Sequence, residues 1–199
     1  MFDPKVNQYI QLLKEFNETT NIYSKRSYGQ LHYHVQDSIN IAEQISNSKI
    51  HVDLGSGSGL PGIVLSIMSN VEVICIESKE RKREFLEYAK SSLELDNLHI
   101  YNGDVQSFTK NYSGGKITSF SAKAFAKPPK LLMYLSMFRP HQYRSNALCW
   151  VPISARQKDV LQSFDSIQTI RADEDFFYFK IRMDSFRSYK ADLKNQYNL

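Results

Sequence analysis

The chain has 199 residues, with 25 Lys and Arg against 21 Asp and Glu, which leaves a formal net charge of +4. Hydrophobic residues make up 42% and aromatic residues 13%, and this excludes a disordered or a fibrous chain. Two cysteines, Cys75 and Cys149, are too few for a disulfide framework and favour a reducing compartment. The first residues lack the apolar stretch of a signal peptide, and the longest mostly apolar run, 60–68, is far short of the ~20 residues of a membrane span. We therefore expect a cytoplasmic protein with no membrane segment.

The first part of the chain is predicted to be helical. Apolar residues at helical spacing predict a helix over 4–20, with Asp3 as its N-cap and Pro4 as its first residue. A second helical region is expected over 28–46. We interpret residues 1–46 as an N-terminal helical extension.

From residue 49 onward, short β-branched runs alternate with helical stretches. This alternation predicts an α/β core with a mostly parallel, seven-stranded sheet and helices on both faces. Because no linker interrupts the pattern, we expect one domain over 1–199, with the core at 47–199. The expected strands are 49–54, 71–76, 98–102, 117–122, 146–151, 166–171 and 176–181, and the expected helices are 60–69, 79–95, about 129–138 and 154–164.

A glycine cluster lies between the first expected strand and the helix after it. A turn of this kind lets the backbone approach a ligand closely, and the helix that follows offers free N–H groups. One interpretation is a dinucleotide fingerprint with Glu77 as the ribose contact. Another is the S-adenosylmethionine (SAM) loop of class I methyltransferases, and a third is a structural turn without a ligand. The glycines are Gly55, Gly57, Gly59 and Gly62.

Three details favour SAM. Asp53 stands directly before the first glycine, where a carboxylate can face a ligand's ammonium but would repel a pyrophosphate. The dinucleotide glycines begin five residues after the last strand valine, which is late for a tight turn. Asp104 and Val105 follow the third strand, where the adenine of SAM is usually contacted.

The same residues have roles beyond the glycine loop. Glu77 closes the second strand and could accept both ribose hydroxyls, or it could be a solvated strand end. Asp104 could take the adenine amino group while Val105 packs on the ring. Asp104 would also serve as the N-cap of a helix over 105–110, and the two roles are compatible.

With these motifs in place, the chain resembles the RsmG (GidB) family of bacterial small-subunit rRNA guanine-N7 methyltransferases over roughly residues 8–182. The most specific part is the run from Asp53 to Gly62, because its Leu-Pro-Gly tail is narrower than generic class I loops. Supporting matches are Asn17 to Asn21, His34-x-x-Asp37-Ser38, Glu77-Ser78, Arg81-Lys82, Phe85-Leu86 and Ala124-Phe125-Ala126.

The resemblance implies a Rossmann-like class I methyltransferase fold, SAM as cofactor, and methyl transfer to a guanine N7 of 16S rRNA or of a small ribosomal subunit particle. It also implies SAM contacts at Gly55, Leu60, the pair Val105-Gln106 and Lys123, with Lys123 as the candidate catalytic residue.

Several positions depart from the family pattern. The family has arginine where Lys123 stands, and lysine lacks the bidentate fork. Gln106 replaces the acidic residue usual in its pair, and a Lys-Gly pair expected after the fifth strand is absent from the run Cys149 to Ile153, where Pro152 stands. These departures bear on catalytic rate and substrate placement more than on fold or cofactor.

The chemistry of guanine N7 agrees with the residues present. This nitrogen already carries a free lone pair, so the enzyme needs to position it rather than deprotonate it. Transfer to cytosine C5 would instead need a nucleophilic cysteine, and both cysteines are predicted inside strands. Phe125, Tyr28 and Tyr33 are candidates for holding an unstacked base, with core packing as the alternative for each.

Basic residues suggest where RNA would bind. Lys25, Arg26, Arg81 and Lys82 could meet phosphates, although the last two could instead pair with glutamates on a solvated helix. His32 and His34 with Asp37 could suggest a metal, but the spacing lacks a third firm ligand, so we expect no metal site. We expect a monomer. The alternatives left open are a methyltransferase acting on another RNA or a small molecule, a catalytically weak RNA- or ribosome-binding relative, and an NAD-binding oxidoreductase.

Overall fold

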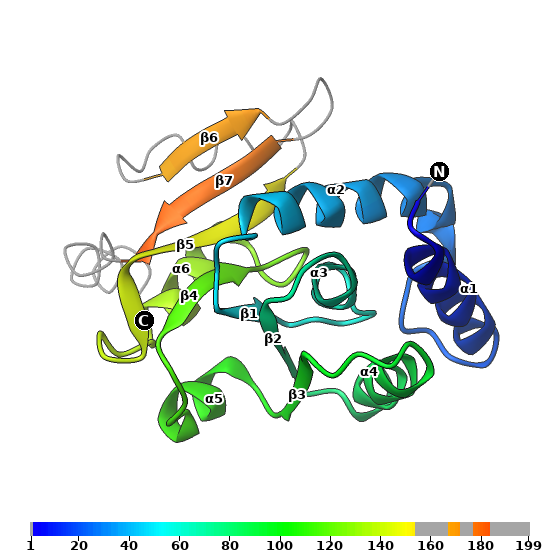
Figure 1. The fold of residues 1–199 in the computed structure, drawn as a ribbon, viewed down its shortest axis with the longest axis horizontal. Helices are drawn as coiled ribbons and strands as arrows, with labels where there is room; N and C mark the ends of the chain where they lie inside the picture. The colour runs from blue at the N-terminus through cyan, green and yellow to red at the C-terminus, as the bar shows by residue number, and fades with distance from the viewer. Residues whose placement is uncertain (1, 154–166, 172–176, 184–199) are drawn as a thin grey trace.

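The computed structural model describes residues 2–153, 167–171 and 177–183. Within these residues one seven-stranded sheet has the order β3-β2-β1-β4-β5-β7-β6 (Figure 1). The strands are β1 (Ile50–Leu54), β2 (Glu72–Glu77), β3 (Leu98–Asn102), β4 (Ile117–Ser121), β5 (Tyr143–Ile153), β6 (Ile167–Arg171) and β7 (Phe177–Arg182). The helices are α1 (Pro4–Thr19), the 3-10 helix η1 (Lys25–Gln30), α2 (Leu31–Gln44), α3 (Gly62–Met68), α4 (Glu80–Ser92), α5 (Val105–Asn111) and α6 (Pro128–Ser136).

The expected mostly parallel sheet is confirmed. Strand β1 runs parallel to β2 and β4, β2 is parallel to β3, and β4 is parallel to β5. Strand β7 is antiparallel to both β5 and β6. The helix expected over 154–164 lies outside the described residues. Strand β5 is longer than expected and includes Pro152, which pairs with Tyr178 in the antiparallel register.

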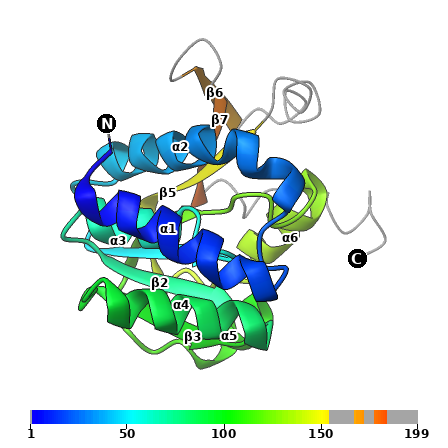
Figure 2. The ribbon, with the colours of Figure 1, turned by 90° about the vertical axis from the view of Figure 1, so that its right-hand side faces the viewer.

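Two hydrophobic clusters pack on opposite faces of the sheet. Neighbouring residues of β2 belong to different clusters, since Cys75 faces α3 and α4 whereas Ile76 faces the side of α5 and α6. In Figure 1 α3 and α4 lie to the right of the sheet and α5 and α6 to its left. Helices α1 and α2 form an outer layer over α3, which Figure 2 views from the side of α1. The N-terminal extension is therefore packed on the face that carries α3 and α4.

Helix α1 begins where the sequence predicts. Asp3 caps it by accepting a hydrogen bond from the backbone N–H of Lys5 at 2.8 Å, and Pro4 opens the first turn. Its buried face includes Val6, Tyr9 and Leu13, which follow the helical period and join the core of α3 and α4.

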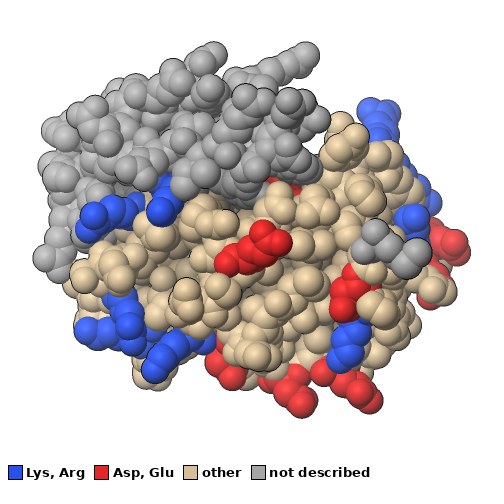
Figure 3. All heavy atoms as spheres, turned by 45° about the horizontal axis from the view of Figure 1, so that its top comes forward, with Lys and Arg blue, Asp and Glu red and all other residues tan. Residues whose placement is uncertain are grey.

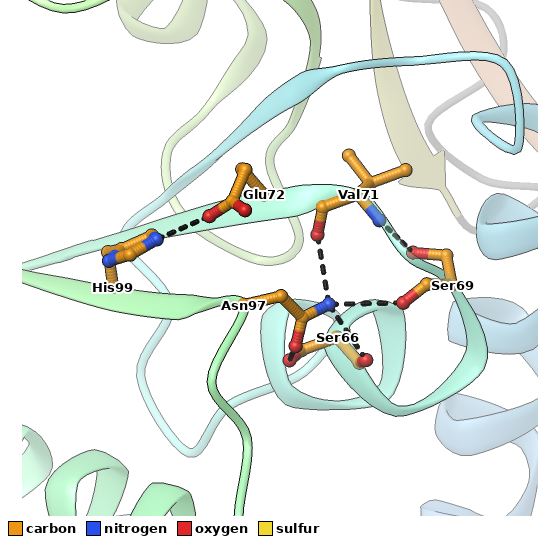
Figure 4. Close-up of polar contacts among 6 residues, drawn as sticks. All are labelled: Ser66, Ser69, Val71, Glu72, Asn97 and His99. Atoms are coloured by element: carbon orange, nitrogen blue, oxygen red, sulfur yellow. Dashed lines mark hydrogen bonds and ion pairs between the residues drawn. The ribbon is translucent and has the colours of Figure 1, made fainter.

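Asn97 joins the amino-terminal ends of β2 and β3, the end of the sheet opposite to the glycine loop (Figure 4). Its amide nitrogen donates to the carbonyls of Ser66, Ser69 and Val71 at 3.0–3.1 Å, and its oxygen accepts from the Ser66 hydroxyl at 2.6 Å. Two of these carbonyls, those of Ser66 and Ser69, lie at the end of α3, where backbone carbonyls have no partner inside the helix. The bonds of Asn97 fix how α3 leads into β2.

No helix within the described ranges combines the length and the apolar character needed to cross a membrane.

Candidate cofactor site

The glycine loop follows β1 at the carboxyl edge of the parallel strands. Gly55 adopts a φ of +68°, a left-handed conformation that glycine adopts without steric cost. A Cβ at this position would also collide with the ring of Phe125. Gly62 opens α3, and a Cβ there would collide with the sulfur of Cys75 on β2. These two glycines therefore allow close contacts that any larger residue would prevent.

Glu77 connects the end of β2 to the loop. Its carboxylate accepts from the backbone N–H of Gly57 at 2.9 Å and from that of Lys79 at 2.8 Å, one bond on each oxygen. The residue is buried, yet it lines a pocket. Because each carboxylate oxygen has room for a second hydrogen bond, Glu77 can still accept from a ligand hydroxyl.

The pocket lies beside Gly55 at the ends of β2 and β3. Its volume is about 340 Å³, within the range of small-molecule sites. Two carboxylates, two ammonium groups and two aromatic rings surround it. The lining residues are Gly55, Ile76, Glu77, Ser78, Lys79, Lys82, Gly103, Asp104, Val105, Ala124, Phe125 and Tyr134.

The structure brings together only some of the residues predicted to bind the cofactor. Four of them line the pocket, namely Gly55, Glu77, Asp104 and Val105. Gly57 contributes its N–H to Glu77 from the neighbouring turn. The predicted residues outside the lining are Asp53, Gly57, Gly59, Leu60, Gln106 and Lys123.

Asp53 faces the interior rather than the pocket. Only 1% of it is exposed, and its carboxylate accepts from the Ser121 hydroxyl at 2.6 Å and from the Gly62 N–H at 3.3 Å. Burial raises the pKa of Asp53 to about 6, and these hydrogen bonds oppose that rise. Any contribution of Asp53 to cofactor binding therefore acts through the loop and helix that it holds.

A buried chain of hydrogen bonds extends from Asp53 across two strands. Ser121 donates to Asp53, so its oxygen accepts from Nε2–H of His51 at 2.8 Å. The other ring nitrogen, Nδ1, then accepts from the Ser119 hydroxyl at 2.8 Å. Burial lowers the pKa of His51 to about 3, so the ring stays neutral, and its two hydrogen bonds select this tautomer. These hydrogen bonds could not be predicted from the sequence, because they need β1 and β4 as neighbours.

Asp104 caps its helix as the sequence predicts, and it also stands at the pocket. It caps α5 by accepting from the Ser107 N–H at 2.7 Å, and it lines the pocket. That backbone bond lowers the pKa of Asp104, which keeps the carboxylate ionised and able to accept from an amino group.

Lys123 contacts α2 in place of the pocket. Its ammonium lies 3.0 Å from a carboxylate oxygen of Asp37, with the two side chains only 12% and 11% exposed. The ion pair joins the segment after β4 to the N-terminal extension. His34, one turn before Asp37, has its Nδ1 2.7 Å from the Tyr23 hydroxyl, and burial together with the charge of Lys123 lowers the pKa of His34 to about 4. These side chains thus belong to a polar interface under α2.

The four predicted RNA-binding cations lie in different places. Lys82 lines the pocket, Arg81 is exposed on α4, and Lys25 and Arg26 are exposed on η1. In the part of the chain that the structure describes, neither Arg81 nor Lys82 is ion-paired with a glutamate of α4. On the face shown in Figure 3, basic groups gather at the left, whereas basic and acidic groups lie next to one another at the right.

Two aromatic residues complete the pocket. Phe125 is the base-holding candidate that reaches it, whereas Tyr28 stacks on Tyr23 within the N-terminal extension and Tyr33 is exposed on α2. Tyr134, on α6, was not among the predicted residues. The sequence signal was weak, because one tyrosine in a helix rich in leucine resembles a core residue.

The glycine loop and the strand-end carboxylates lie within a region that matches a known family. The sequence model of the family described as rRNA small subunit methyltransferase G (GidB) matches residues 3–141. The chain belongs to this family. The match includes the glycine loop, Glu77, Asp104 and Lys123.

Individual members of the family are 30–39% identical to the chain. The rRNA small subunit methyltransferase G of Ruthia magnifica is 31% identical over 130 residues, which cover 64% of this chain and 62% of the relative. That of Rickettsia africae is 39% identical over 104 residues, covering 51% and 54%. The matches thus span about half to two thirds of the length of these relatives.

Solved structures share the fold at low identity. Cofactor-bound Rv0187 from MTB superposes with a TM-score of 0.64 and 12% identity, covering 92% of this chain and 91% of that one. The SAH-bound Podospora anserina methyltransferase PaMTH1 gives a TM-score of 0.63 and 9% identity, covering 91% and 88%. The fold expected from the sequence, that of class I SAM-dependent methyltransferases, is confirmed.

Proposed function

We propose that this chain is a SAM-dependent methyltransferase that methylates a guanine N7 of 16S rRNA. The observation that carries the proposal is the placement of Glu77 and Asp104 at the ends of adjacent strands, in one pocket with Gly55. Membership of the rRNA small subunit methyltransferase G family supports the RNA substrate.

The chemistry of the pocket fits SAM. Glu77 would accept from the ribose hydroxyls, Asp104 from the adenine amino group, and Val105 would pack on the adenine ring. The glycine loop would lie along the methionine part, where Gly55 exposes its backbone. When bound, SAM would supply an electrophilic methyl group on its sulfonium.

Catalysis would rest on placement. Among the residues that the structure describes, the lining contains no histidine or cysteine that could act as a general base or nucleophile. Guanine N7 needs neither, because its lone pair is free, and holding it in line with the methyl group can supply several kcal/mol, up to ~7–11. Lys79 and Lys82 would meet the RNA phosphates at the pocket. We further propose that the protein acts as a monomer in the cytoplasm.

The test is transfer of tritium from methyl-labelled SAM to 16S rRNA and to small ribosomal subunits from a strain that lacks this protein. We expect incorporation at one guanine, detected by strand scission at N7-methylguanine. Glu77→Ala should weaken SAM binding by ~1.5–3 kcal/mol, measured by calorimetry, because charged hydrogen bonds are lost.

Other results would change the assignment. Tight binding of NAD without binding of SAM would overturn the assignment of SAM as the cofactor. SAM binding with label in another RNA or in a small molecule would overturn the substrate, and ribosome binding without transfer would indicate a catalytically weak relative.

A further inference from the structure

The segment after β4 presents one aromatic ring to the glycine loop. Lys123 is held to α2 by its ion pair with Asp37. The next residue, Ala124, adopts a φ of +50°, a left-handed conformation that residues with a Cβ rarely take. The chain therefore turns sharply, and Phe125 follows with its ring against Gly55.

A second ring extends this surface. The rings of Phe125 and Tyr134 have their centroids 5.1 Å apart at an interplanar angle of 48°, and both residues are half-buried and line the pocket. They come from different elements, the segment after β4 and helix α6. We call these two residues the aromatic wall.

The aromatic wall has no role in the ribose or adenine contacts assigned above to the strand ends. Both residues are partly exposed, and the pocket that they line is otherwise rich in charged groups. The ammonium of Lys130 lies 5.8 Å from the centroid of the Tyr134 ring. Aromatic rings beside a cation are the usual means of holding an unpaired nucleotide, since the rings stack on the base and the cation meets the phosphate.

We infer that the aromatic wall is the stacking surface for the base that receives the methyl group, with Lys130 beside the phosphate of that nucleotide. The inference rests on the proposed function, because it needs a nucleic-acid substrate. The wall adjoins the glycine loop through Phe125 and Gly55, so a base stacked there lies next to the methionine part of the cofactor. The strained turn at Ala124 then serves to place the ring.

The experiment compares leucine with aromatic replacements. In Tyr134→Leu and Phe125→Leu, kcat/KM for 16S rRNA should fall by about 5- to 150-fold, the range that loss of one base–aromatic stack produces, chiefly through KM. Tyr134→Phe should keep kcat/KM within about two-fold of wild type. The Kd for SAM, measured by calorimetry, should stay within about two-fold in both Tyr134 variants. Tyr134 is the decisive position, because Phe125→Leu also alters the packing on Gly55.

The outcomes separate this inference from the function on which it rests. Wild-type protein that binds SAM but methylates no RNA overturns both. If the wild-type protein is active and Tyr134→Leu is equally active, the inference that the aromatic wall stacks on the base is overturned, and the proposed function stands. A loss of SAM affinity in Tyr134→Leu as large as the loss in kcat/KM also overturns it, since the wall would then hold the cofactor.

Discussion

The hydroxyl of Tyr9 donates a hydrogen bond to the carbonyl of Ser58 at 2.8 Å. Tyr9 lies on α1 and is fully buried, whereas Ser58 lies in the middle of the glycine loop. Burial raises the pKa of Tyr9 well above its usual value, so the hydroxyl remains a donor. The N-terminal extension thus supports the loop that the proposed cofactor would contact.

Tyr9→Phe tests this support. The substitution keeps the ring and removes the donor, which leaves the Ser58 carbonyl without this partner, so the free energy of unfolding should fall by about 1–2 kcal/mol. SAM should bind several-fold more weakly, because the loop is less ordered. Urea denaturation and calorimetry measure the two effects. Tyr88→Phe, at an exposed tyrosine of α4, is the matched control and should change neither quantity. Unchanged SAM affinity in Tyr9→Phe would show that the support is not needed for binding.

The ion pair between Lys123 and Asp37 yields a second prediction. Lys123→Ala removes the ammonium that lies 3.0 Å from the buried Asp37 carboxylate, so the free energy of unfolding should fall by about 3 kcal/mol. Methyl transfer should fall with it, because Phe125 depends on the same segment. Lys123→Arg should keep both stability and transfer, since the charge is retained.

The double variant Lys123→Met/Asp37→Leu distinguishes positioning from direct chemistry. It removes both charges, so most of the stability should return. We expect a substantial part of the transfer to return as well. If stability returns and transfer does not, the ammonium of Lys123 itself acts on the cofactor or the base.

The buried His51 predicts how stability depends on pH. Burial lowers its pKa from 6.5 to about 3, so between these values the unfolded chain binds a proton that the folded chain does not. The contribution of His51 to the free energy of unfolding is complete above pH 6.5. It decreases as the pH falls, by about 1.4 kcal/mol per pH unit. Between pH 6.5 and 4.5, the free energy of unfolding of His51→Gln should therefore fall by about 2 kcal/mol less than that of the wild type, as measured by urea denaturation.

The contribution of Asp53 to stability depends on pH in the opposite direction. Its pKa rises from 3.8 to about 6 on folding, so its contribution to stability decreases as the pH rises through this interval. Asp53→Asn should therefore make the loss of stability at low pH steeper than in wild type. If stability depends on pH in the same way in the wild type, His51→Gln and Asp53→Asn, the buried hydrogen bonds of His51 and Asp53 do not have the effect described.

The dependence of RNA binding on salt tests the cations. Each phosphate contact that is removed should flatten the slope of log affinity against log salt by roughly 0.7–0.9. We expect this for Arg81→Ala and for Lys25→Ala/Arg26→Ala, while Arg81→Lys should keep the wild-type slope. Lys82→Ala is tested beside them. Among these charge variants, it alone should change the affinity for SAM, because Lys82 lines the pocket. Parallel slopes in all variants would place the RNA elsewhere.

The parts of the site that depend on residues close together along the chain were predictable from the sequence. The glycine loop, the capping by Asp104 and the carboxylate that closes β2 are all found as predicted, since local backbone geometry requires those residue types. The alternation of strand and helix likewise predicts the sheet, because each element must bury one face.

The distant side chains that support that site are known from the three-dimensional packing and not from the sequence. The hydrogen bond of Tyr9 to Ser58, the ion pair of Lys123 with Asp37 and the packing of Phe125 on Gly55 join residues 49, 86 and 70 positions apart. Lys123 looked like a free cation in the sequence, and Asp53 like a ligand contact, because a sequence does not state where a charge is buried. Which partner a buried polar group receives follows from the order of the strands and from the helices that cover them.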